Sequence, residues 1–192
     1  MNDDPNRAAE APLSESKGAA DNGAVHRLVV SSQAGTAAVA RVVAEALRGG
    51  DVVLLIGDLG AGTTTFTKAL AEALGVSESV TSPTFTLLRT YATPALTLIH
   101  VDAYRLEGPA GLDDLALPEL LDDNGCAVVE WGDLVAGALG PDHLDIHFDP
   151  SDDENARQIS LVGRGEWVAR LETLSFDLSD AGGHGAEHAM SA

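Results

Sequence analysis

A glycine-rich segment at residues 57–64, with the sequence GDLGAGTT, has the spacing of the phosphate-binding loop G-x-x-x-x-G-K-[ST]. Glycines in such a loop let successive backbone N–H groups point inward, and the N-terminus of the following helix adds partial positive charge toward a phosphate. The Thr64 hydroxyl would lie in the first helical turn, where it can ligate Mg²⁺. We therefore predict a site for ATP or ADP with Mg²⁺. Its expected nucleotide-binding residues are Asp58, Leu59, Gly60, Ala61, Gly62, Thr63, Thr64, Thr65 and Trp131.

Position 63 departs from this motif, because threonine stands where the motif has lysine. A lysine ammonium bridges the β- and γ-phosphates and balances the charge that develops during phosphoryl transfer. Each charged hydrogen bond that is lost costs roughly 1.5–3 kcal/mol, so we expect nucleotide affinity to fall at least about tenfold and hydrolysis further. Lys68 is no substitute, since it lies more than one helical turn beyond Thr63 and faces elsewhere.

Two carboxylates follow apolar runs that read as strands. Residues 126–129 are apolar and end at Glu130, as the strand beside a phosphate-binding loop does when it supplies the second Mg²⁺ contact. In the segment HVDAYR at 100–105, alternation places His100, Asp102 and Tyr104 on one face, where they could orient water or magnesium. The alternative is structural, with Asp102 paired to Arg105 or His100.

Two further features are open to two interpretations each. The segment Thr81, Ser82, Pro83, Thr84 and Phe85 is either a switch-like loop that senses the nucleotide or a plain turn. Trp131 either forms a wall of the nucleotide pocket or belongs to the core. Cys126, the single cysteine, allows no internal disulfide, and we expect it to be a buried packing residue.

Apolar strand-like runs alternate with helical patterns between about residues 25 and 173, which predicts an α/β fold with a mostly parallel sheet and flanking helices. We expect this P-loop NTPase-like domain to end in an antiparallel hairpin of residues 145–149 and 158–162. The other expected strands are residues 27–31, 51–56, 84–91, 96–101 and 126–129. The expected helices are residues 32–48, 63–74 and 112–121, the first capped by Ser32 or Thr36.

The ends of the chain differ from this central part in composition. Residues 1–24 are polar and acidic without sustained apolar periodicity, and residues 174–192 read similarly, so we predict two disordered tails around the domain at 25–173. The N-terminus lacks the basic and apolar segments of a signal peptide, and no apolar run is long enough to span a membrane. These features, with the single cysteine, predict a cytoplasmic protein.

The net charge of −19 argues against a protein that grips nucleic acid by its own surface. Proteins that do so need a basic stripe to displace the counterions of phosphates. We therefore expect no direct strong contact with nucleic acid.

Four motifs in order closely resemble the bacterial TsaE family of tRNA threonylcarbamoyladenosine biosynthesis ATPases. They are GDLGAGTTTF at 57–66, TSPTF at 81–85, HVDAYRL at 100–106 and VVEWG at 128–132. The resemblance implies a P-loop fold and an ATPase that acts with TsaB and TsaD partners to modify the adenosine beside the anticodon. It also implies that Thr64 and Glu130 contact Mg²⁺, that Asp102 is needed for hydrolysis, and that residues 81–85 form the switch-like loop.

Two other functions stay open at this point. The first is a non-catalytic adaptor, in which the impaired loop is kept as a scaffold for partner docking; Thr63 motivates it. The second is a small-molecule kinase, which would close an arginine-bearing lid over the phosphates. Only Arg89 and Arg105 lie centrally, and the sequence shows no arginine-rich lid segment, so the kinase is the weaker alternative.

Overall fold

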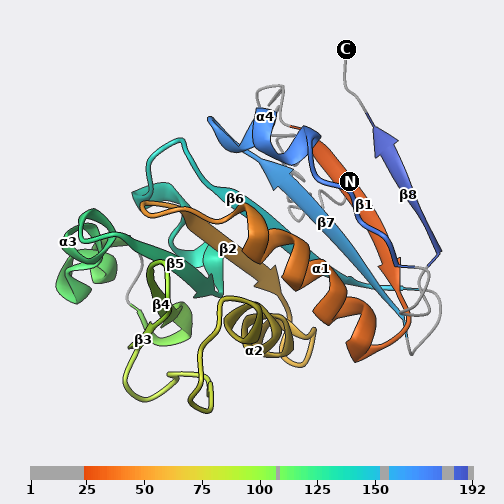
Figure 1. Cartoon of the computed structure of the whole chain (residues 1–192). Coiled ribbons are helices and arrows are strands. Elements are labelled where there is room, and N and C mark those ends of the chain that lie inside the picture. The colour runs from red at the N-terminus through yellow and green to blue at the C-terminus, as the bar shows by residue number, and fades with distance from the viewer. Residues whose placement is uncertain (1–23, 107–108, 152–155, 179–183, 190–192) are drawn as a thin grey trace, which may run out of the picture.

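A mixed sheet of eight strands runs through the part of the chain that the computed structural model describes, which is residues 24–106, 109–151, 156–178 and 184–189 (Figure 1). The strand order is β3-β4-β5-β2-β6-β7-β1-β8. The strands are β1 (Val25–Val30), β2 (Val52–Gly57), β3 (Leu88–Ala92), β4 (Thr97–Asp102), β5 (Gly125–Glu130), β6 (Leu144–Pro150), β7 (Arg157–Gly163) and β8 (His184–Ala189).

The centre of the sheet is parallel and its flanks are antiparallel. Strands β4, β5, β2 and β6 are parallel neighbours, whereas β3, β7, β1 and β8 pair antiparallel. The predicted α/β class with flanking helices is confirmed, although parallel pairing is restricted to the four central strands. The expected hairpin is present as β6 and β7, but it lies inside the sheet because β1 pairs with the far side of β7. Parallel strands bring their carboxyl ends to one edge, so the ends of β2, β4 and β5 meet there.

In the described part of the chain, four α-helices and several short 3₁₀ segments surround the sheet. The helices are α1 (Gln33–Ala46), α2 (Thr63–Ala73), α3 (Leu117–Asp122) and α4 (Trp167–Glu172). The 3₁₀ segments are η1 (Ala103–Arg105), η2 (Pro109–Leu115), η3 (Gly132–Leu134) and η4 (Ala136–Ala138). Helices α1 and α2 pack together on one side of the sheet (Figure 1). Ser32 caps α1, as predicted, by accepting a hydrogen bond from Gly35 N at 3.1 Å.

The central strand β2 is buried on both faces of the sheet, which is why its sequence is continuously apolar. Val53 and Leu55 pack in the core cluster beneath α1 and α2. Val52 and Leu54 pack on the opposite face, with residues of η2, α3 and η4. Cys126 is fully buried, as predicted, and burial raises the pKa of its thiol to about 12. The thiol therefore stays protonated, and the side chain contributes to core packing.

The segment before β3 differs from the predicted strand over residues 84–91. The strand begins only at Leu88, because Thr86 N and Leu87 N both donate to Pro83 O and close a turn. Leu87 has a left-handed backbone with φ of 64°, which interrupts extended pairing. Residues 84–87 therefore lie outside the sheet and form a loop.

The predicted helix over residues 112–121 is broken into two pieces. Segment η2 ends at Leu115, Ala116 adopts a left-handed conformation with φ of 52°, and α3 begins at Leu117. Pro118 lies in the first turn of α3, where its missing N–H leaves no helical hydrogen bond unmade. The proline therefore starts a helix here and is not accommodated within one.

The C-terminal boundary also differs from the expected start of a tail at residue 174. Leu178 is buried, and the ring of Phe176 meets His26 edge-on with centroids 5.3 Å apart. Helix α4, which we did not predict, precedes this segment and buries Trp167 and Leu171. The tail predicted at 1–24 lies outside the described residues except for its last position.

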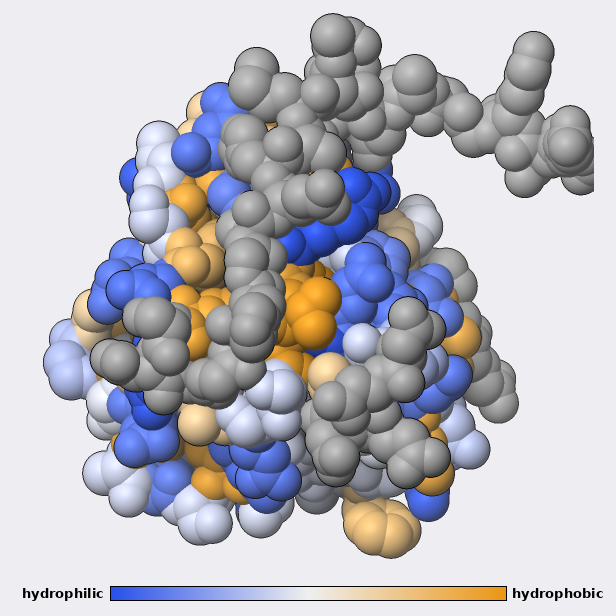
Figure 2. Space-filling view, turned by 90° about the vertical axis from the view of Figure 1, so that its right-hand side faces the viewer, coloured by the Kyte–Doolittle hydropathy of each residue, from blue (hydrophilic) through white to orange (hydrophobic). Residues whose placement is uncertain are grey.

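The surface seen in Figure 2 is largely hydrophilic, with a hydrophobic area near its centre. Among the described residues, none of the helices combines the length and the hydrophobicity needed to cross a lipid bilayer.

Phe66 links the helix that follows the glycine loop to the core, and its removal is expected to destabilise the fold. Its ring is fully buried and meets Phe148 edge-on, with centroids 5.7 Å apart. A Phe66→Ala chain should lose about 3–5 kcal/mol of unfolding free energy, because a cavity replaces the ring. Chemical denaturation measures this loss. Phe85→Ala is the matched control, since that ring is 87% exposed and its removal should change stability by less than about 0.5 kcal/mol. Equal losses in the two variants would contradict the packing described here.

Candidate functional site

The glycine loop between β2 and α2 has the backbone geometry of an anion site. Gly60 and Gly62 have positive φ angles of 83° and 113°, and no atom lies within 4 Å of a Cβ built at either position. Gly62 precedes α2 without any side-chain cap. The first amides of a helix have no carbonyl partner within the helix, so those of α2 remain available to a phosphate placed in the open space before them.

Glu130, the last residue of β5, connects the loop to the neighbouring strand. The Thr63 and Thr64 hydroxyls both donate to Glu130 Oε2, at 2.9 and 2.7 Å. The other carboxylate oxygen, Oε1, lies 2.8 Å from His100 Nε2. Glu130 is only 4% exposed, and these three contacts satisfy a carboxylate that would otherwise be costly to bury. Thr64 and Glu130 thus lie together, as a shared magnesium site requires.

Asp102, the last residue of β4, anchors the segment predicted to be a switch-like loop. Its Oδ2 accepts hydrogen bonds from the Ser82 and Thr84 hydroxyls, both at 2.8 Å, and its Oδ1 accepts from Tyr104 N at 3.1 Å. The structural alternative, an ion pair with Arg105 or His100, is not what the structure shows. His100 bonds to Glu130, and the Arg105 guanidinium lies over the Phe85 ring, 4.9 Å from its centroid.

A cavity of about 440 Å³ opens where these groups meet. Its polar side combines carboxylates and hydroxyls, the hard oxygen ligands that Mg²⁺ prefers. Its apolar side includes Tyr104 and Trp131, whose ring centroids are 5.1 Å apart. Trp131 combines features of both interpretations, because it lines this cavity and also packs against the core cluster around Val52 and Leu54. The lining residues, none of which is a lysine or an arginine, are Asp58, Leu59, Gly60, Thr63, Thr64, Ser82, Thr84, Asp102, Tyr104, Glu130 and Trp131.

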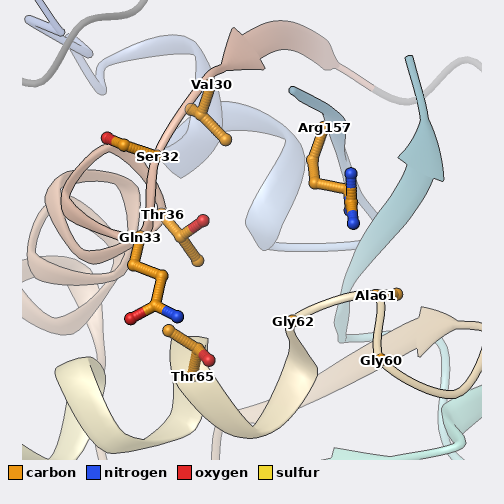
Figure 3. A pocket seen from close by; sticks show the side chains of 9 residues that line it. All are labelled: Val30, Ser32, Gln33, Thr36, Gly60, Ala61, Gly62, Thr65 and Arg157. Atoms are coloured by element: carbon orange, nitrogen blue, oxygen red, sulfur yellow. The ribbon is translucent and has the colours of Figure 1, made fainter. Parts of the chain in front are cut away.

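A second cavity, of about 170 Å³, lies on the other side of the glycine loop (Figure 3). The loop and the start of α2 form its floor, α1 and the end of β1 form one side, and Arg157 of β7 lies on the other. Figure 3 shows Gln33 beside Thr65, across the cavity from Arg157. Its lining residues are Val30, Ser32, Gln33, Thr36, Gly60, Ala61, Gly62, Thr65 and Arg157.

Sequence reasoning did not identify Ser32, Gln33, Thr36 or Arg157 as site residues, apart from the capping role of Ser32 and Thr36. Ser32, Gln33 and Thr36 lie next to the loop because β1 and α1 pack beside β7 and α2, a tertiary arrangement that no local motif encodes. The predicted residues 58–65 instead divide between the two cavities. His100 is fully buried and does not line either cavity, so the expected convergence of His100, Asp102 and Tyr104 holds for Asp102 and Tyr104 alone.

A buried central strand, a glycine loop with a positive-φ turn, and a helix at the carboxyl edge of parallel strands define a protein of the P-loop class. The family model described as "Threonylcarbamoyl adenosine biosynthesis protein TsaE" matches residues 30–159. The chain therefore belongs to the TsaE family.

Individual relatives agree with this assignment. The tRNA threonylcarbamoyladenosine biosynthesis protein TsaE of Bacillus subtilis is 40% identical over 144 residues, which are 75% of this chain and 87% of that protein. The protein of the same name from Streptomyces coelicolor is 45% identical over 136 residues, 66% of this chain and 88% of the relative. The crystal structure of Bacillus subtilis YdiB superposes with a TM-score of 0.67 at 32% identity and covers 78% of this chain and 93% of YdiB.

Proposed function

We propose that this chain is the ATP-binding subunit for threonylcarbamoyladenosine modification of tRNA, and that it acts in the cytoplasm with TsaB and TsaD partners. The observation that carries the proposal is the meeting of Thr64, Glu130 and Asp102 at the end of the glycine loop, in a chain of the TsaE family. Relatives named for tRNA threonylcarbamoyladenosine biosynthesis support the pathway.

The two cavities suggest how a nucleotide would lie. The phosphates would occupy the loop, whose amides and open glycine positions face them. The magnesium side is the larger cavity, because Thr64 and Glu130 line it. The nucleoside would then extend from these phosphates on the side away from the larger cavity, toward the cavity with Gln33, Thr65 and Arg157. We therefore propose that the base and sugar occupy the smaller cavity.

The residues of the larger cavity have distinct expected roles. Bound magnesium would neutralise phosphate charge and fix the geometry of the terminal phosphates. The Thr64 hydroxyl donates a hydrogen bond to Glu130, which would leave its oxygen lone pairs available to hold the ion. Asp102 is positioned to orient a water molecule, and its hydrogen bonds to Ser82 and Thr84 connect that role to the switch-like loop. Thr63 supplies no positive charge, so we expect weak hydrolysis.

Large apolar side chains are exposed around the mouth of the larger cavity, which favours a protein partner at this face. Leu59 in the glycine loop is 93% exposed, Phe85 is 87% exposed, and Tyr104 is 59% exposed. Exposed apolar groups gathered at one place mark interaction surfaces more often than isolated ones do. The net charge of −19 favours a division of labour in which the partners hold the tRNA.

A replacement experiment in Bacillus subtilis tests the proposed function. The gene for the native relative is exchanged for this chain, and threonylcarbamoyladenosine in total tRNA is measured by mass spectrometry. We expect modification to persist with the Thr63→Lys chain and to be reduced with the parent chain. Gly62→Val should abolish it, because φ of 113° is strained for any side chain and the loop would lose its phosphate-binding shape.

Gly137→Ala is the matched control, because its φ is not positive and a Cβ there meets no atom within 4 Å. That variant should behave as the parent does. Loss of modification in the parent and in Thr63→Lys alike, with all chains folded, would contradict the proposal.

The adaptor is the second candidate function, and the contact between Thr63 and Glu130 favours it. Thr63, which stands at the lysine position, bonds to Glu130, the proposed magnesium ligand. This hydrogen bond holds the glycine loop against β5 without nucleotide. An adaptor would bind TsaB and TsaD equally well with and without Mg-ATP, whereas a nucleotide switch would not. Undiminished tRNA modification by Gly62→Val would likewise support the adaptor.

A further inference from the structure

His100 is a fully buried histidine in the middle of the sheet whose role the motif does not explain. In the parallel register of β4 and β5 it lies opposite Val128, two residues before Glu130, and therefore on the same face as Glu130. Its Nε2 lies 2.8 Å from Glu130 Oε1, and its Nδ1 has no hydrogen-bond partner among the described residues. The contact with Glu130 is thus the hydrogen bond that the structure shows for the His100 side chain.

The two carboxylate oxygens of Glu130 bond to side chains from different elements. Oε2 faces the Thr63 and Thr64 hydroxyls, and Oε1 faces His100. A carboxylate can only accept hydrogen bonds, so Nε2 carries the proton and donates. Without this donor, Oε1 would be buried and unsatisfied, and the carboxylate would rotate to relieve the cost. That rotation would remove the arrangement of Oε2 beside Thr64.

We propose that His100 is a positioning residue, which holds the Glu130 carboxylate in the orientation that magnesium binding requires. The proposal rests on the proposed function, since it assigns the magnesium side of the larger cavity to Glu130. His100 does not line that cavity, and it acts through Glu130. Donors behind metal ligands commonly change metal affinity by about 10–100-fold when they are removed.

The test compares two amides that differ in reach. In His100→Gln the side-chain N–H₂ falls near the place of Nε2, whereas in His100→Asn it falls near the place of Nδ1 and stops short of Glu130. ADP affinity is measured by calorimetry for the full-length chain with Mg²⁺ and with EDTA, and the ratio of the two affinities is the magnesium enhancement. We expect His100→Gln to keep this enhancement within about threefold of the parent and His100→Asn to lose about tenfold or more. Affinity in EDTA should be unchanged in both.

His143→Asn is the matched control, because His143 is also a buried histidine but lies just before the start of β6 and bonds to Gly140 O. It should leave the enhancement unchanged, and denaturation curves establish that each variant is folded. Equal enhancement in His100→Asn and the parent would overturn the positioning role while leaving nucleotide binding in place. Equal loss in the Gln and Asn variants would also overturn it, because the donor would then not matter. If the parent chain bound no ADP, this result would contradict the proposed function and, with it, the role of His100.

Discussion

A Thr63→Lys chain is expected to bind Mg-ATP at least about tenfold more tightly than the parent, because a charged hydrogen bond to phosphate contributes roughly 1.5–3 kcal/mol. The substitution restores a positive charge to a cavity whose lining has carboxylates and no basic residue. Hydrolysis should rise by a larger factor, since the ammonium stabilises charge that develops only in the transition state. Calorimetric titration with Mg-ATP and Mg-ADP measures the affinity, and phosphate release measures the hydrolysis.

The control must separate a charge in the loop from a change in the total charge of the protein. Thr173→Lys adds the same charge at an exposed position at the end of α4, remote from the glycine loop in sequence and on another helix. It should leave nucleotide affinity as in the parent, because exposed charges beyond a Debye length are screened. Equal tightening in both variants would indicate a general charge effect. If neither the parent nor Thr63→Lys bound nucleotide, the result would contradict the nucleotide hypothesis and favour the adaptor.

The elements around the site could be predicted because each carries a local signal. The continuous apolar run of β2 and the glycines before α2 fixed the position of the loop, and α2 begins at Thr63 as expected. Apolar runs that end in a carboxylate likewise identified the ends of β4 and β5. Parallel pairing of β4, β5 and β2 then brings Asp102, Glu130 and the loop to one edge. This part of the site follows from periodicity and from topology that is common to parallel sheets.

The remaining features depend on contacts between distant segments. His100 shares a face of the sheet with Asp102, as predicted, but it lies two residues earlier in β4, is fully buried and bonds to Glu130. The hydroxyls of Ser82 and Thr84 gave no sign of their common partner 18–20 residues later. The smaller cavity needs β1, α1 and β7 to pack around the loop, and Arg157 enters it from more than 90 residues away in the sequence.

Asp102→Asn is expected to lower ATP hydrolysis by about 10²–10³-fold in the Thr63→Lys background, with nucleotide affinity nearly unchanged. An asparagine oxygen can still accept from the Ser82 and Thr84 hydroxyls, so the switch-like loop should keep its place, while the negative charge and the acceptor for Tyr104 N are lost. The substitution therefore separates the charge of Asp102 from its anchoring role. Asp102→Ala removes both, and it should additionally loosen residues 82–84, which hydrogen exchange of the Ser82 and Thr84 amides would detect.

Asp133→Asn provides the matched control, because it removes one negative charge from an exposed residue just beyond Glu130 without touching the larger cavity. It should hydrolyse ATP at the rate of its background. If Asp102→Asn hydrolysed equally fast, the carboxylate would serve only to hold the loop, and the structural interpretation of Asp102 would prevail. If instead Asp102→Asn and Asp102→Ala both failed to hydrolyse ATP but differed in the protection of the Ser82 and Thr84 amides, the two roles of Asp102 would be distinct. Its charge would serve hydrolysis, and its hydrogen bonds would hold the switch-like loop.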